Sequence, residues 1–114
     1  MTDEGQIKIF AALDFIKNNA KPYAIAKAQR IHLEEYRKTK KALCMKTAER
    51  AGHNTAAAQE REAYADPDYA ELLDGLKEAT EKEETLRWLI VAAQASIEVW
   101  RTIEANKRAE AKVL

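Results

Sequence analysis

Two histidines and one cysteine, His32, His53 and Cys44, are the residues of the sequence best suited to binding a metal ion. A zinc site needs three or four such ligands at fixed spacing, and carboxylates rarely supply most of them. His32 lies four residues before Tyr36, which is the spacing of neighbours on one helical face. We therefore expect His32 to be a packing histidine and Cys44 to be a small buried side chain, with no metal and no cofactor.

Glu81, Glu83 and Glu84 form a short cluster of carboxylates. These three do not share one helical face, and no facing Glu-x-x-His pair of the di-iron type accompanies them. The sequence also has no glycine-rich phosphate loop, no Gly-x-Ser-x-Gly turn and no spaced Ser, His and Asp set. We interpret the cluster as a solvated face and expect no enzyme activity.

The most suggestive feature is a run of cations beside an aromatic residue. Four cations in five positions can neutralise phosphates, and the adjacent ring can stack on a base. Further cations extend the run toward Arg50. The candidate nucleic-acid-binding residues are Tyr36, Arg37, Lys38, Lys40, Lys41 and Lys46. The alternative is an ordinary solvated helix face.

The charge of the whole chain gives no argument for nucleic acid, because 19 basic and 19 acidic residues cancel and the pI is near 6.7. The charge is nevertheless segregated along the chain. Residues 21–53 hold nine Lys or Arg and three Glu, whereas residues 66–86 hold eight acidic residues and two Lys. In an antiparallel hairpin these stretches would neutralise each other. If Glu78, Glu81 and Glu84 cover the cations, the DNA hypothesis weakens.

The elements that carry these residues should all be helices, because three Gly and two Pro in 114 residues leave too few turns for a many-stranded sheet. The stretch from Asn18 to Pro22 should end a first helix, and Gly52 should end a second. Thr55 and Asp66 should be the N-caps of the third and fourth helices. The predicted helices cover about 3–18, 22–51, 55–64 and 67–111. This is an all-α fold: a single domain, 1–114, with a long antiparallel hairpin (22–51 and 67–111), a short N-terminal helix and a short helical connector.

The last helix carries a heptad-like seam, which is typical of a coiled coil. Nine of its ten positions are apolar or aromatic. They are Leu72, Ala79, Leu86, Ala93 and Trp100 in one register and Tyr69, Leu76, Glu83, Ile90 and Ile97 in the other.

From Leu86 to Ile103, further apolar residues widen this seam around most of the helix, so it should be buried on several sides. Trp88 and Trp100 are twelve residues apart, about 120° around the axis, and one partner can hardly cover both. We expect a homodimer. Its predicted interface residues are Leu86, Trp88, Ile90, Ile97, Trp100 and Ile103.

The start of the sequence is acidic where a signal peptide would be basic, and a single cysteine fits a reducing compartment. The longest nearly uncharged run, 88–97, is about ten residues and too short to span a bilayer. We expect a cytoplasmic protein with no membrane partner.

Three parts of the chain carry a resemblance to a group of known proteins: 33–43, 57–69, and 98–101 together with 105–109. They read LEEYRKTKKAL, AAQEREAYADPDY, and EVWR with ANKRA. Together they resemble small helical proteins encoded among the replication and recombination genes of tailed bacteriophages. The resemblance implies a phage origin, the host cytoplasm and a setting in DNA metabolism, but no catalytic residue. Two functions follow as hypotheses: a DNA-binding accessory protein of phage replication or recombination that contacts phosphates without sequence preference, or a protein–protein interaction module (adaptor or inhibitor of a host or phage protein) without DNA binding.

Overall fold

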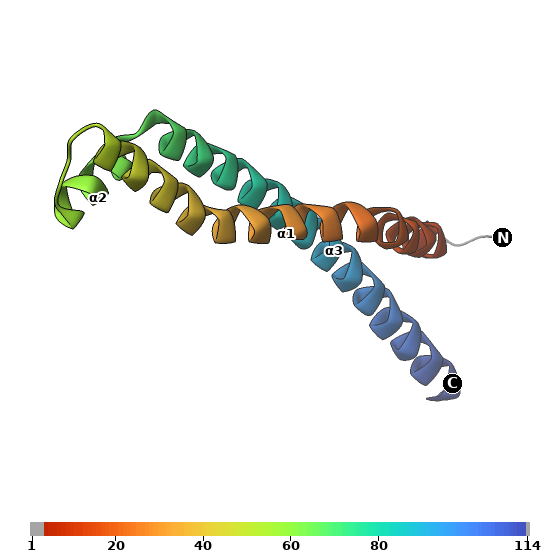
Figure 1. Cartoon of the computed structure of the whole chain (residues 1–114). Coiled ribbons are helices and arrows are strands. Elements are labelled where there is room, and N and C mark those ends of the chain that lie inside the picture. Colours follow the sequence, from red (N-terminus) through yellow and green to blue (C-terminus); the bar gives the residue numbers. More distant parts are fainter. Residues whose placement is uncertain (1–3, 114) are drawn as a thin grey trace. The chain divides into compact units, whose positions relative to one another are not determined.

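The computed structural model describes residues 4–113, which form three α-helices and no strand. The helices are α1 (Glu4–Arg50), α2 (Ala56–Ala65) and α3 (Pro67–Val113), shown in Figure 1. The all-α prediction is confirmed. The described residues divide into two compact units: unit 1 comprises 4–24 of α1 and 84–113 of α3, and unit 2 comprises 25–83.

Unit 2 is an antiparallel helical hairpin closed by α2. The yellow part of α1 lies beside the green part of α3, and α2 sits at their shared end (Figure 1). Cys44 of α1, Ala63 of α2 and Tyr69 of α3 form a buried cluster, with Met45 packed against it. Each of the three helices contributes one buried residue to this cluster, and Ala63 of α2 has no exposed surface. The expectation that Cys44 is buried is confirmed.

The turn after α1 has the hydrogen bonds of a glycine-terminated helix. Gly52 adopts a left-handed conformation with φ of 105°. Its N–H donates to the carbonyl of Glu49, and the N–H of His53 donates to that of Ala48, both at 3.1 Å. This pair of bonds satisfies carbonyls that the helix end leaves open, and it confirms the end predicted at Gly52.

The two predicted N-caps are also confirmed. Thr55 Oγ1 accepts a hydrogen bond from the N–H of Ala58 at 3.1 Å, which caps α2. Asp66 Oδ1 accepts one from the N–H of Asp68 at 2.8 Å, directly before α3. Pro67 occupies the first position of α3, where a missing N–H costs nothing.

The predicted boundary between a separate N-terminal helix and the next helix is wrong, because α1 continues through Pro22. Proline removes the N–H that would bond the carbonyl of Asn18. Both residues are exposed, so water can satisfy that carbonyl. Asn19 also donates from its side-chain Nδ2 to the carbonyl of Phe15 at 2.8 Å. Good helix formers on both sides outweigh the local penalty.

The predicted seam of α3 is confirmed in full. All ten of its positions, from Tyr69 to Trp100, are buried or half-buried. A matching pattern runs along α1, where buried and half-buried residues recur at alternating spacings of three and four. They are Ile9, Ala12, Ile16, Asn19, Tyr23, Ala26, Arg30 and Leu33. This is the repeat by which two helices pack side by side.

Candidate functional site

The basic run lies on α1 within unit 2, and its six candidate residues do not form one uniform surface. Tyr36 is exposed and stacks on His32, with ring centroids 6.0 Å apart and planes at 15°. His32 is exposed as well. The expectation that His32 is a packing histidine is therefore wrong: the four-residue spacing does place the two rings on one helical face, but this face is exposed.

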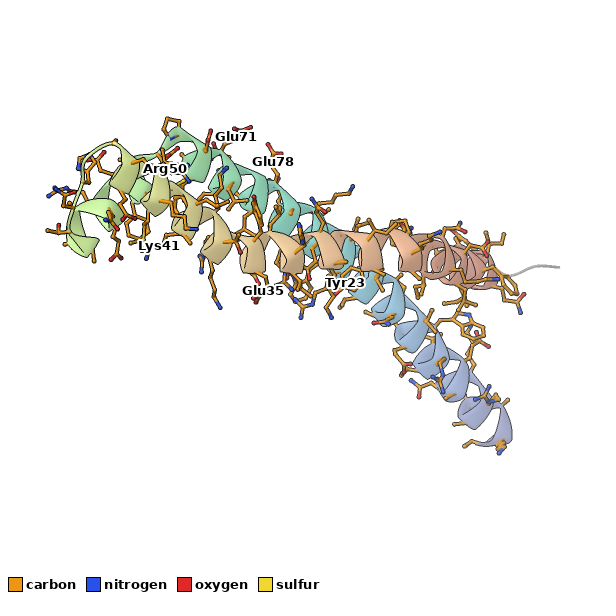
Figure 2. All side chains as sticks on the ribbon, in the orientation of Figure 1. Tyr23, Glu35, Lys41, Arg50, Glu71 and Glu78 are labelled. Atoms are coloured by element: carbon orange, nitrogen blue, oxygen red, sulfur yellow. The ribbon has the colours of Figure 1, made fainter. Side chains whose placement is uncertain are left out.

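Lys41 is tied to α2 and is not free for a phosphate. Its Nζ donates to Glu60 Oε1 at 3.0 Å and to the Tyr64 hydroxyl at 2.9 Å, and it lies 4.7 Å from the centre of the Tyr64 ring. The hydrogen bond with Tyr64 and then that with Glu60 raise the pKa of Lys41. Tyr64 in turn meets the edge of Tyr69 at 5.6 Å. Lys41 thus joins α1 to α2 (Figure 2).

Lys40 is partly neutralised too, while the rest of the run is open. Lys40 Nζ lies 3.9 Å from Asp68 Oδ2 at the start of α3. The other three cations of the candidate set, Arg37, Lys38 and Lys46, are exposed. The structure therefore splits the basic run into two paired lysines and three exposed cations.

The acidic partners differ from those considered in the sequence. Glu71 and Glu78 project from the edge of the hairpin away from Lys41 (Figure 2). Glu84 Oε2 instead accepts hydrogen bonds from Arg87 and from the indole N–H of Trp88, each at 3.1 Å. Partial neutralisation thus comes from Glu60 and Asp68.

A second charged contact lies inside the seam of unit 2. Glu83 is only 4% exposed, which corrects the interpretation of the acidic cluster as a wholly solvated face. Arg30 donates from Nε and Nη2 to the two oxygens of Glu83, the latter at 3.0 Å, and from Nη1 to Glu34 at 2.9 Å. The hydrogen bond with Glu83 raises the pKa of Arg30. This fork holds α1 and α3 in one register.

Unit 1 carries an open groove of about 820 Å³ between α1 and α3. Its lining is almost wholly apolar or small. The residues are Gly5, Lys8, Ile9, Ala12 and Phe15 of α1, and Leu89, Ala92, Ala93, Ala95, Ser96, Val99, Trp100 and Ile103 of α3. From Leu89 to Ile103 the α3 wall is about 21 Å long at 1.5 Å per residue. A groove of this length and composition suits an apolar helix face.

The predicted interface residues lie on two faces of α3 in unit 1. Leu86, Ile90, Ile97 and Trp100 are half-buried seam residues, whereas Trp88 and Ile103 are exposed. Sequence reasoning missed that the exposed face has its own repeat. We call it the second stripe: Trp88, Leu89, Ala92, Ala95, Ser96, Val99 and Ile103, seven residues of α3 that are all exposed. The signal was present in the spacings of three and four between Leu89, Ala92, Ser96, Val99 and Ile103.

One polar atom in the groove wall is unsatisfied. Nε1 of Trp100 is buried and has no hydrogen-bond partner in the part of the chain that the structure describes. A buried unpaired donor costs about 1–3 kcal/mol. The unpaired indole N–H therefore lowers the stability of unit 1.

The described residues contain no group of three His, Cys, Asp or Glu side chains that could hold a metal ion. In residues 4–113 no helix is both long and apolar enough to cross a membrane. A scan of protein-family models and searches of curated proteins and of solved structures return no match for this chain. The resemblance to phage proteins therefore stays a prediction, and function has to be inferred from the two surfaces.

Proposed function

We propose that the protein is a non-enzymatic protein–protein interaction module that binds an apolar helix face in the groove of unit 1. The observation that carries this proposal is the second stripe. From Trp88 to Ile103, α3 presents two apolar faces, and α1 covers only the seam. Ile9 is the one buried apolar residue among the described residues of unit 1.

An open apolar groove on this scale indicates a docking surface. Helix-in-groove recognition uses apolar anchors at spacings of three, four and seven on the docking helix. The small side chains of Ala92, Ala95 and Ser96 let such a helix approach closely, and Leu89 and Ile103 flank them as larger contacts. Val99 is 59% exposed, so covering it would remove apolar area from water and stabilise the complex.

The test uses a fluorescent naphthalene sulfonate dye, whose emission rises when it binds exposed apolar surface. Dye emission is measured with the full chain at a series of protein concentrations. Val99→Glu places a charge in the groove and should abolish most of the emission. Leu73→Glu is the matched control, because Leu73 is an exposed apolar residue of α3 in unit 2. Equal emission from both variants and the unmodified protein at every dilution would exclude the groove as a docking surface.

Sequence-independent DNA binding is the second candidate, and the exposure of Arg37, Lys38 and Lys46 favours it. The resemblance to phage replication and recombination proteins also supports this candidate. Two observations weaken it: Lys40 and Lys41 are paired, and residues 25–83 hold eleven Lys or Arg against twelve Asp or Glu. Three phosphate contacts would give a slope of log affinity against log salt of about −3.

Fluorescence polarisation with single- and double-stranded oligonucleotides tests this candidate at low and moderate salt. The double variant Arg37→Gln, Lys38→Gln should weaken binding equally for all sequences. The double variant Lys77→Gln, Lys82→Gln removes two exposed cations of α3 and should weaken it less. If no oligonucleotide binds at low salt, DNA binding is excluded and the protein–protein interaction module remains as the proposed function.

A further inference from the structure

We propose that the helix received by the groove is α3 of a second copy of this chain, running antiparallel about a two-fold axis between Ala95 and Ser96. The inference rests on the proposed function, because it names the occupant of the same groove. In the resulting dimer, the second stripes of the two copies face each other.

The order of side-chain sizes along the second stripe is the first argument for self-pairing. Large residues lie at its two ends, Trp88 and Leu89 at one and Val99 and Ile103 at the other, and small residues lie between them. A partner helix can therefore approach most closely at the centre of the stripe.

Three pairs of stripe residues share one midpoint, between positions 95 and 96. They are Trp88 with Ile103, Ala92 with Val99, and Ala95 with Ser96. Antiparallel pairing about this midpoint sets Val99 of each copy against Ala92 of the other, so that a large side chain meets a small one. Large against small is how facing helix positions interdigitate without voids. Parallel pairing would set Val99 against Val99 and Ala92 against Ala92, which leaves a gap between the alanines.

The area available indicates a reversible dimer. Trp88, Leu89, Val99 and Ile103 are each about half exposed. With aromatic and large aliphatic side chains of roughly 150–250 Å², they and the small stripe residues would bury about 500 Å² per copy. The sum of about 1,000 Å² lies just below the 1,200–2,000 Å² of stable specific interfaces. Dissociation on dilution is therefore expected.

Disulfide trapping tests both the partner and the register, in a Cys44→Ala background that removes the native thiol. Ala95→Cys places two thiols about 1.5 Å apart along the axis and should cross-link with itself under mild oxidation. Ala92→Cys alone and Val99→Cys alone separate them by about 10 Å along the axis, beyond disulfide reach. An equal mixture of Ala92→Cys and Val99→Cys should instead yield the mixed dimer. Ala70→Cys, exposed on α3 in unit 2, is the control for random collision.

Each outcome decides the proposal. Cross-linking of Ala95→Cys and of the mixture, with the single variants silent, supports the antiparallel dimer. Self-linking of all three variants indicates parallel pairing and overturns it. No linking above the Ala70→Cys control, together with a monomer in sedimentation at every concentration, overturns it as well. In that last case a dye signal still lost in Val99→Glu would leave the proposed function standing with a different partner.

Discussion

Units 1 and 2 both contain parts of α1 and α3, yet they bury different numbers of apolar residues. Unit 2 buries five apolar residues, and three of them meet where α2 packs on the hairpin. Unit 1 buries one among its described residues and leaves a groove open along α3. Two helices can cover only one stripe of each other. A third helix closes unit 2, whereas the described residues of unit 1 belong to α1 and α3 alone.

The charges follow the same contrast. In unit 2, Arg30 pairs with Glu83, Lys40 with Asp68 and Lys41 with Glu60, and each of these pairs joins two helices. Four ion pairs in the described part of unit 1 join neighbours on one helix. They are Lys8–Glu4, Arg87–Glu84, Arg101–Glu98 and Lys107–Glu104. An ion pair within one helix does not fix the position of that helix against a neighbouring helix. The ion pairs therefore help to set the register between helices in unit 2 and not in the described part of unit 1.

Tyr69→Ala should produce the largest effect, because it empties the cluster that closes unit 2. Truncation of a buried aromatic residue costs about 3–5 kcal/mol of unfolding free energy. Phe10→Ala in unit 1, where Phe10 is 63% exposed, should change it by less than about 0.5 kcal/mol. Urea unfolding followed by circular dichroism measures both, and similar losses would contradict the contrast between the units.

Pro22→Ala should stabilise α1. The substitution restores a hydrogen bond to the Asn18 carbonyl and removes the ring clash. After allowance for the greater freedom of the unfolded chain, the gain is about 2 kcal/mol. A rise in the thermal unfolding midpoint checks it. A fall would mean that the proline conformation is required in this turn.

Thr55→Ala should weaken the docking of α2. It removes the oxygen that accepts from the N–H of Ala58, at a cost of about 1 kcal/mol. Thr55→Ser keeps that oxygen and serves as the control. Both variants are compared by thermal unfolding, and equal midpoints would show that the cap contributes nothing.

Trp100→Phe should be nearly neutral in unit 1. The change loses some apolar area but also removes the buried unpaired indole N–H. We expect the free energy of unfolding to change by less than about 1 kcal/mol. A loss of several kcal/mol in urea unfolding would show that the N–H has a partner in solution.

The smallest effect concerns the pH dependence of unit 2. The hydrogen bond from Lys41 lowers the pKa of Glu60 from its ordinary value of 4.5. The pair therefore stabilises the fold above this value, and its contribution is lost as the pH falls through the lower folded pKa. Unfolding midpoints of the unmodified protein and Glu60→Gln should differ at neutral pH and converge in acid. Parallel curves would exclude the linkage.

The ends of the helices were predictable because each depends on a few adjacent residues. Gly52 supplies a left-handed turn, and Thr55 and Asp66 supply acceptors for the N–H groups of the next turn. The same local reasoning failed at Pro22, where a preference for a break competes with strong helix formers on both sides.

The seam was predictable for a different reason. Its repeat of three and four residues is a property of one helix, and it correctly identified Glu83 as a seam position despite its charge. The second stripe has the same kind of repeat. The sequence does not separate this stripe from the seam, because spacing alone does not say which apolar face a neighbouring helix covers.

The helical class, the caps and the seam can be predicted from the amino-acid sequence, since each follows from contacts within a few turns of one helix. Which charges meet depends instead on how the helices pack together. Arg30 and Glu83 are 53 residues apart, and Lys41 finds Glu60 on α2. Pairing at such separations depends on the register between helices, which no local pattern records. The same holds for the groove, because exposure of an apolar stripe depends on how many helices surround it.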